Sequence, residues 1–174
     1  MSTLTSELSN QELVSSELIA LQARSPLFSR PGFLIRRMHQ IHGFLFAEET
    51  DGFDITPVQY SLLTTLDTFG ELDQNTLAIQ VGLERSSVAE VIPRLHTRGL
   101  VVRGQAAHDK RLRLVKLSLK GKRLVARMSD AVQRAHSRTI ETLSREEQDI
   151  FMLLMIKLVE ANNSESVVPF KLPK

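Results

Sequence analysis

Basic side chains are concentrated in one stretch of this sequence, and the most direct chemistry of such a stretch is the binding of phosphate. Residues 85–138 carry 14 Lys and Arg but only three Asp and Glu, a net charge of +11. Residues 1–84 carry 4 basic and 11 acidic side chains, a net charge of −7. A solvated face usually mixes the two signs, so this segregation favours a surface that meets a nucleic acid.

Part of this charge lies on a helix predicted over residues 84–98. A shorter helix precedes it over residues 74–81, with Asp73 as its N-cap and Gly82 at its end. Two short helices joined by a tight turn that contains a glycine form a helix-turn-helix unit, whose second helix enters the major groove of DNA. We expect DNA contacts near the N-terminal end of that second helix from Arg85, Ser86, Ser87, Glu90 and Arg94.

Each of these side chains has a chemical reason to lie there. Arg85 has donors for a bidentate contact to guanine, or for holding a phosphate. Ser86 and Ser87 suit phosphate oxygens near the positive end of a helix. Glu90 either accepts from a cytosine amine or pairs with Arg94 four residues later, and the sequence leaves both roles open.

Pro93 is at odds with the helix that contains it. It cannot donate a hydrogen bond to the carbonyl of Ala89, and its ring clashes there, so a kink or an early end is predicted. Alternatively, a bend toward solvent absorbs the proline and the helix persists.

A β-hairpin follows the helix. Residues 100–102 are predicted as a strand, residues 104–111 as a polar turn, and residues 112–117 as the returning strand. Asp109 does not favour phosphate, so we expect a structural role for it, holding Arg111 or an amide of the turn. The hairpin would serve as a wing beside the helix, with DNA contacts from His108, Lys110, Arg111 and Arg113.

Helical periodicity on both sides of this region predicts further amphipathic helices. One runs over residues 33–49, and a longer one with a single apolar seam runs over residues 118–142. A capping box at residues 144–147 starts a last helix that is apolar on most faces. Such a helix needs a partner to cover it, and homodimerisation is the simplest source of that cover.

The predicted fold class is therefore mainly α with a small β-hairpin wing: a winged helix-turn-helix with a helical dimerisation platform. Residues 56–118 form the DNA-binding domain, and residues 31–55 and 119–163 form the dimerisation region. Residues 1–30 form an N-terminal extension, in which the leucines at 13, 18 and 21 indicate a short amphipathic helix. Residues 164–174 form a C-terminal tail.

The order of these elements and four pieces of sequence resemble the MarR family of winged helix-turn-helix regulators, over about residues 33–160. The pattern of aspartate, basic residue and arginine in the wing is specific when it is combined with the exit from the preceding helix into Gly-Leu-Val. The four pieces are ITPVQY at 55–60, LAIQVGL at 77–83, LHTRGLV at 95–101 and DKR at 109–111.

The resemblance implies an obligate homodimer with intertwined terminal helices that binds a palindromic operator on double-stranded DNA, often as a repressor. It places Arg111 in the minor groove, where narrow A·T tracts attract arginine. Many members release DNA when a small, frequently aromatic and anionic compound binds between the dimerisation platform and the DNA-binding lobe. Pro93 departs from the family pattern, because most members carry a helix-forming residue there.

We therefore expect a ligand-responsive repressor of catabolic or stress genes, with a small aromatic acid as effector. Its candidate binding site comprises Arg36, His39 and His42 on one helix, with Tyr60 on the next. Arginine or imidazolium would hold the anion while apolar neighbours pack on the ring. In the opposing interpretation, these side chains simply face solvent or an interface. His39 and His42 have a spacing that suits a metal, but no third ligand is apparent, so we expect neither a metal nor a cofactor.

Several classes of protein are disfavoured by composition. The sequence contains no cysteine, which excludes disulfides, thiolate metal sites and thiol redox sensing. Its longest apolar run, residues 151–156, is too short to span a bilayer, and the acidic N-terminus lacks the order of a signal peptide. We expect a cytoplasmic protein without a membrane partner. The carboxylates and histidines form no recognisable catalytic pattern, so we expect no enzyme.

Two other non-enzymatic functions stay open. A constitutive architectural DNA-binding protein without an effector would bind DNA regardless of metabolites. A winged helix that has turned to protein interaction would show no salt-dependent affinity for DNA, which is contrary to the basic charge of residues 85–138.

Overall fold

The structure is a computed structural model that describes residues 2–105, 113–165 and 168, with side chains from residue 13 onward. The chain divides into two compact units, Met1–Phe44 and Leu45–Lys174.

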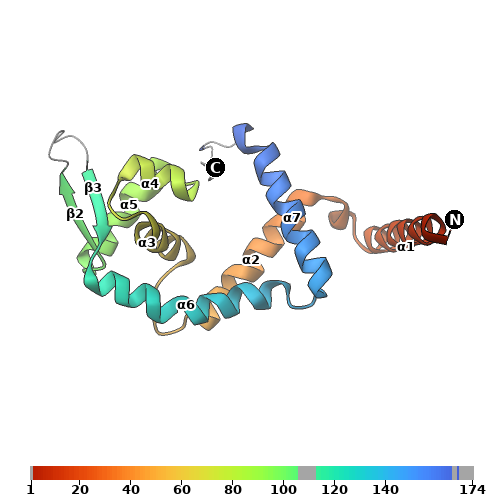
Figure 1. Cartoon of the computed structure of the whole chain (residues 1–174), viewed down its shortest axis with the longest axis horizontal. Helices are drawn as coiled ribbons and strands as arrows, with labels where there is room; N and C mark the ends of the chain where they lie inside the picture. Colours follow the sequence, from red (N-terminus) through yellow and green to blue (C-terminus); the bar gives the residue numbers. More distant parts are fainter. Residues whose placement is uncertain (1, 106–112, 166–167, 169–174) are drawn as a thin grey trace. The chain divides into compact units, whose positions relative to one another are not determined.

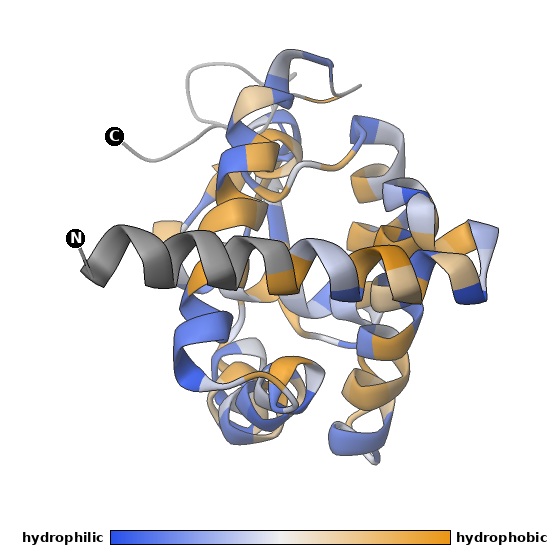
Figure 2. Ribbon diagram, turned by 90° about the vertical axis from the view of Figure 1, so that its right-hand side faces the viewer, coloured by the Kyte–Doolittle hydropathy of each residue, from blue (hydrophilic) through white to orange (hydrophobic). Residues whose placement is uncertain are grey.

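The first unit is entirely helical (Figure 1). Helix α1 spans Ser2–Arg24, so the amphipathic helix expected around residues 13–21 is part of a longer one. Its apolar side chains from Leu13 to Leu21 are exposed, and they form orange turns in Figure 2. A 3-10 turn, η1 (Pro26–Ser29), leads into α2 (Pro31–Glu49), which begins two residues before the predicted start.

The second unit begins with the last residues of α2, followed by α3 (Pro57–Phe69). A capping box starts α3. The amide of Gln59 donates to Thr56 Oγ1 at 3.2 Å, and the amide of Thr56 donates to Gln59 Oε1 at 3.1 Å. Pro57 occupies the first turn, where its missing N–H leaves no intrahelical bond unmade.

The helix-turn-helix is formed by α4 (Gln74–Val81) and α5 (Arg85–Thr97). Asp73 caps α4 by accepting from the amides of Asn75 and Thr76, at 2.9 and 3.1 Å. Gly82 adopts a φ of 65° at the end of α4, a left-handed conformation that glycine tolerates without strain. Both of these sequence predictions are confirmed.

The sheet has three antiparallel strands in the order β1-β3-β2. Strands β2 (Val101–Gln105) and β3 (Arg113–Leu117) form the predicted hairpin, and β2 is longer than the three residues expected. The third strand, β1 (Leu72–Asp73), was not predicted. It pairs Leu72 with Val115 and fixes the start of α4 to the wing.

Two helices follow the sheet, α6 (Leu119–Ile140) and α7 (Arg145–Ala161), and the 3-10 turn η2 (Asn163–Glu165) comes after them. Ser118 caps α6 by accepting from the amide of Gly121 at 2.9 Å. The predicted capping box of α7 is present between Ser144 and Glu147. No residue of α7 is buried.

The core of the second unit forms between α3, α4, α5, α6 and one face of the sheet, which orients the helix-turn-helix against the wing. Each buried leucine, isoleucine or valine stabilises the fold by roughly 1.5–3 kcal/mol relative to an exposed side chain. The largest fully buried side chains are Leu62, Leu63, Leu66, Leu77, Val88, Ile92, Leu95, Val101, Val115 and Met128.

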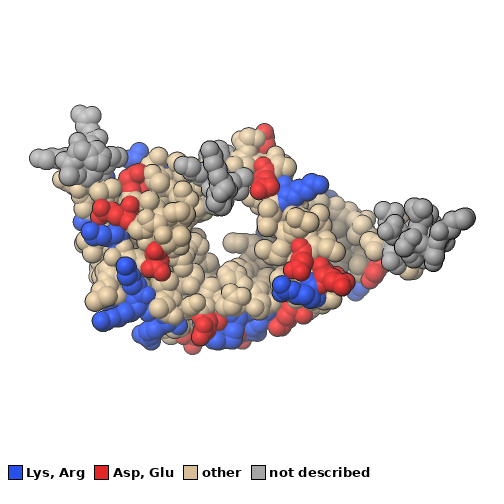
Figure 3. Space-filling view, viewed as in Figure 1, with Lys and Arg blue, Asp and Glu red and all other residues tan. Residues whose placement is uncertain are grey.

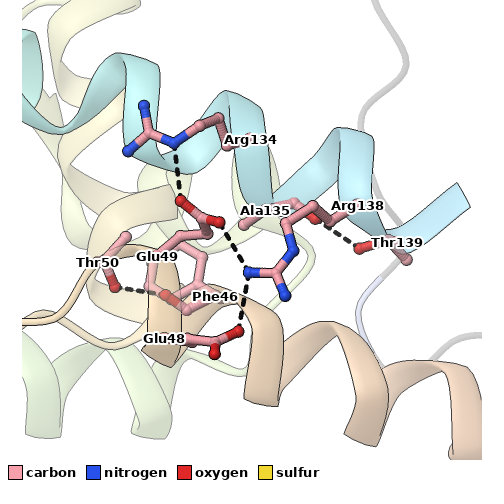
Figure 4. Close-up of polar contacts among 8 residues, drawn as sticks. All are labelled: Phe46, Glu48, Glu49, Thr50, Arg134, Ala135, Arg138 and Thr139. Atoms are coloured by element: carbon pink, nitrogen blue, oxygen red, sulfur yellow. Dashed lines mark hydrogen bonds and ion pairs between the residues drawn. The ribbon is translucent and has the colours of Figure 1, made fainter. Parts of the chain in front are cut away.

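An ionic cluster fixes the end of α2 on α6 (Figure 4). Glu49 binds Arg134 Nε at 2.8 Å with one carboxylate oxygen and Arg138 at 2.7 Å with the other. Arg138 also binds Glu48 at 2.8 Å. Hydrogen bonds from Arg134 and then Arg138 hold the pKa of Glu49 below its ordinary value. The carboxylate is therefore charged near neutral pH, and both links persist there.

Candidate DNA-binding surface

Helix α5 presents one polar face to solvent. Its buried side is formed by Val88, Ile92 and Leu95, which pack into the core. Because successive residues are rotated by about 100° around a helix, the centre of the opposite, exposed face is at four positions. These positions are Ser86, Glu90, Pro93 and Thr97.

The two arginines of α5 lie on opposite margins of this exposed face. Arg85 is exposed on one margin, and Ser87 is half-buried. Arg94 lies on the other margin, where it lines a hollow of about 390 Å³ together with the loop between α2 and α3, including Asp54. Arg94 is thus placed to contact this loop as well as a ligand in front of the helix.

The structure bears on one of the two roles left open for Glu90, the pairing with Arg94. Among the ion pairs of the described residues there is none between Glu90 and Arg94. The exposed Glu90 carboxylate is therefore available to an outside donor. Nearby, the hydroxyl of Ser86 donates to the Glu84 carboxylate at 3.2 Å.

Pro93 does not end α5 early, so the prediction of an early end was wrong. The helix continues to Thr97, whose hydroxyl donates to the Pro93 carbonyl at 3.0 Å. The physical reason is orientation. Pro93 and Ala89 are both exposed, so the carbonyl that loses its intrahelical partner lies on the solvent side. Core contacts on the other side hold the helix together.

A second basic surface lies between α5 and the wing. Residues directly opposite in an antiparallel pair share a face, and β2 and β3 pair Arg103 with Val115 and Gln105 with Arg113. The face of the hairpin that carries the buried Val101, its inner face, is apolar at the base of the hairpin and basic toward the far end. There Arg103, Gln105 and Arg113 line a hollow of about 430 Å³ together with His96 of α5.

Arg113 was predicted from the sequence as a DNA contact, whereas Arg103 and His96 were not. A usable signal was the alternation that starts at the buried Val101, because it places residue 103 on the inner face. The partnership with His96 depends on packing between elements and leaves no sequence signal. The predicted wing residues His108, Asp109, Lys110 and Arg111 lie outside the described residues.

Arg98 anchors the end of α5. Its guanidinium donates to the carbonyls of Phe53, at 3.2 Å, and Asp54, and lies 3.5 Å from the Asp54 carboxylate. Its own carbonyl accepts from Lys120 Nζ at 2.8 Å. Helix α5 is therefore fixed both to the loop after α2 and to the start of α6.

The candidate effector residues are divided between the two units. Arg36, His39 and His42 lie on α2 in the first unit, three residues apart, so they share one side of that helix. Arg36 and His39 are exposed, and the Arg36 guanidinium lies 5.5 Å from the ring centre of Phe33. Among the described residues, no three His, Asp or Glu side chains are grouped so that they could hold a metal ion.

Tyr60 lies on α3 in the second unit. Its ring packs edge-on against Phe46, with ring centres 6.2 Å apart. Burial, and then the charge of Asp67, raise the pKa of Tyr60 above its ordinary value. The hydroxyl is therefore neutral at physiological pH and able to donate a hydrogen bond.

Comparison with known proteins identifies the family to which the chain belongs. The family model described as "MarR family" matches residues 55–112, from the start of α3 to the wing. The crystal structure of the transcriptional regulator PcaV from Streptomyces coelicolor, in complex with its natural ligand, is 33% identical, with a TM-score of 0.73. The match covers 78% of this chain and 95% of PcaV. The chain belongs to the MarR family.

Two further MarR-type matches agree with this. The transcriptional regulator HosA of Escherichia coli O127:H6 is 29% identical over 125 residues, which cover 72% of this chain and 91% of HosA. BpsR of Bordetella bronchiseptica, whose DNA binding is regulated by 6-hydroxynicotinic acid, is 26% identical with a TM-score of 0.71. That match covers 74% of this chain and 93% of BpsR.

The protein is thus a DNA-binding transcriptional regulator of the MarR type with a winged helix-turn-helix. HosA and PcaV are both transcriptional regulators. Within the described residues, no helix is both long and apolar enough to cross a membrane.

Proposed function

We propose that this MarR-family protein is a homodimeric repressor that binds a palindromic operator and is released by a small aromatic acid, controlling catabolic or stress genes. The observation that carries the DNA-binding part is the juxtaposition of two surfaces. The exposed face of α5 stands beside a basic hollow formed with the wing.

In this proposal the two surfaces have different tasks. The face of α5 at Ser86 and Glu90 reads base edges in the major groove, with Arg85 at its margin. The hollow at Arg103 and Arg113 holds a backbone phosphate, because two guanidinium groups match the charge and the paired oxygens of a phosphate. Arg94 flanks this surface, and the wing tip adds the contacts predicted from sequence for His108, Lys110 and Arg111.

The proposed dimer rests on α7. Along this helix Ile150, Leu153 and Leu158 are each more than half exposed, and Met152, Leu154, Ile156 and Val159 are exposed as well. Burial of this apolar surface against a partner stabilises the assembly by about 25 cal/mol for each Å² removed from water. A second copy supplies a matching face, and two copies bring two recognition helices to the two halves of a palindrome.

The proposed effector is an anion with an aromatic ring. Arg36 and His39 offer positive charge and donors on one side of α2, with His42 one step further along it. The regulation of BpsR by 6-hydroxynicotinic acid supports an acid of this class. PcaV was crystallised with its natural ligand, which supports a ligand-binding regulator. Participation of Tyr60 stays a prediction from the sequence.

The experiment that tests the whole proposal measures DNA release. A labelled duplex from the region upstream of the protein's own gene is bound by the full-length protein, and fluorescence anisotropy is followed during titration with 6-hydroxynicotinic acid and benzoate. We expect at least one acid to release the wild type. We expect Arg36→Ala to need at least tenfold more of that acid with unchanged DNA affinity.

Arg37→Ala is the matched control, because Arg37 is the neighbouring arginine and already donates to Gln40 at 2.9 Å. If neither acid nor a wider set of aromatic acids releases the DNA, the effector part fails and the constitutive architectural function takes its place. Sedimentation that shows a stable folded monomer at micromolar concentration would refute the dimer.

A further inference from the structure

A concave basic surface lies where β2 meets the start of α6, away from the residues assigned to DNA. It is a hollow of about 370 Å³, which falls within the range of small-molecule sites. Three leucines line it, Leu100, Leu119 and Leu124. Its charged lining consists of four cations, Arg98, Lys120, Arg123 and Arg127.

The charge of this hollow is poorly compensated. No Asp or Glu is among the described residues that line it. Of the four cations, only Arg98 forms an ion pair, with the Asp54 carboxylate, in the part of the chain that the structure describes. Lys120 donates to a backbone carbonyl, and the Arg127 guanidinium lies 5.6 Å from the ring centre of Phe53. Figure 3 shows Lys and Arg side chains gathered over the first half of α6.

Two features separate this hollow from the DNA-reading surface. It lies at the base of the hairpin, next to the pair Val101 and Leu117, whereas Arg113 pairs with Gln105 at the far end of the strands. Four residue steps of strand separate the two ends by roughly 13 Å. The hollow is also partly apolar, and Leu119 is 67% exposed at its edge. A phosphate backbone has no apolar group to bury there.

We propose that this hollow is a binding site for a small amphiphilic anion, a carboxylate whose apolar or aromatic body packs on Leu119 and Leu124. Arg123 and Arg127 hold the carboxylate, because no hydrogen bond or ion pair engages either guanidinium among the described residues, and Lys120, which already donates to the Arg98 carbonyl, closes one side. The Arg98 guanidinium links the site to the end of the recognition helix. This proposal does not rest on the effector role of α2, because all of its residues lie between positions 98 and 127.

The test uses full-length, ¹⁵N-labelled protein titrated with 4-fluorobenzoate, with the backbone amide shifts of residues 119–127 as the local readout. Inorganic phosphate is the second probe. The variants are the double substitution Arg123→Ala with Arg127→Ala, and Leu119→Asn, which alters only the apolar edge. Lys122→Ala is the matched control, since Lys122 lies on the same turn of α6 and is not part of the lining.

We expect saturable shifts of these amides in the wild type and in Lys122→Ala. The double variant should bind 4-fluorobenzoate about tenfold more weakly, as the loss of two exposed charge contacts implies. Leu119→Asn should weaken the binding of 4-fluorobenzoate but not of phosphate.

Five results would overturn the proposal. Absence of saturable shifts in this segment would refute a site. Equal affinities of the double variant and Lys122→Ala would refute the assigned residues. Phosphate binding as tightly as 4-fluorobenzoate would refute the amphiphilic class. Shifts of these amides with a DNA duplex but not with 4-fluorobenzoate would assign the surface to DNA. Shifts confined to α2 would overturn this site and leave the proposed function intact.

Discussion

Replacing Gly121 with alanine tests how the wing is positioned on α6. At this point α6 crosses the chain that leads into β2, and a Cβ atom on Gly121 would overlap the carbonyl oxygen of Leu100. The same atom would lie 3.1 Å from Leu117 Cδ2 in the wing. The Leu100 carbonyl cannot move away freely, because it accepts from the amide of Ser118 at 3.0 Å.

The expected magnitude follows from three contributions. Overpacking of a tight contact costs about 1–3 kcal/mol. Loss of the hydrogen bond to Leu100, if the chain shifts to make room, costs about 1 kcal/mol more. Alanine stabilises a helix interior by roughly 1 kcal/mol relative to glycine, which offsets part of this. Gly121→Ala should therefore lower the free energy of unfolding by about 1–3 kcal/mol.

Urea unfolding followed by circular dichroism, at fixed protein concentration, measures this difference. The control is Ala126→Gly, the reverse exchange at an exposed position of the same helix, which calibrates the propensity difference on α6. It should lose about 1 kcal/mol. A Gly121→Ala protein as stable as the wild type, or more stable, would refute the close crossing as the element that fixes the wing.

Three further predictions concern stability. Asp73→Ala should lower the free energy of unfolding, measured in urea, by about 0.5–2 kcal/mol, because two backbone amides lose their cap. Burial raises the pKa of Asp73, but the hydrogen bonds that it accepts, led by the one from Thr76, outweigh burial and lower the pKa below its ordinary value. The stability that this carboxylate adds is therefore present above about pH 4, the pKa of an unfolded Asp, and is lost as the pH falls through the lower pKa of Asp73 in the folded protein. On acidification, Asp73→Ala should lose less stability than the wild type. The pKa of Glu49 is also lowered, so Glu49→Gln should destabilise the protein near pH 7. The difference in stability between wild type and variant should vanish in acid, as Glu49 of the wild type protonates. An equal difference in stability at pH 7 and pH 3 would contradict this. Pro93→Ala restores a hydrogen bond on the exposed side of α5. It should raise the melting temperature and stabilise the protein by at most about 3 kcal/mol. A melting temperature below that of the wild type would mean that the proline is structurally required.

The helix boundaries were largely predictable because their signals are local. The capping boxes at Thr56 and Ser144, the Asp73 cap and the glycine at residue 82 act within four residues of chain, and the structure reproduces each of them. Strand β1 was not predictable in this way. It has only two residues, and it exists because Leu72 meets Val115 across more than forty residues of sequence.

The candidate site was predictable in composition but less so in arrangement. The polar residues of α5 were identified because helical periodicity shows which side is buried. Their partners come from packing between elements. His96 joins Arg103 through the contact between helix and wing, and Arg94 faces a loop some forty residues earlier in the chain. The persistence of the helix through Pro93 likewise depends on which side faces solvent.

The most direct test of the account is the salt dependence of DNA affinity. Each phosphate contact adds about one unit to the slope of the logarithm of the binding constant against the logarithm of salt concentration. The combined substitution of Arg103 and Arg113 by alanine removes the contact to the phosphate held in their hollow and should therefore reduce the wild-type slope by about one, while Lys122→Ala leaves it unchanged. A wild-type affinity that does not fall with salt, or a double variant that keeps the full slope, would contradict the assignment of the α5–wing surface to DNA.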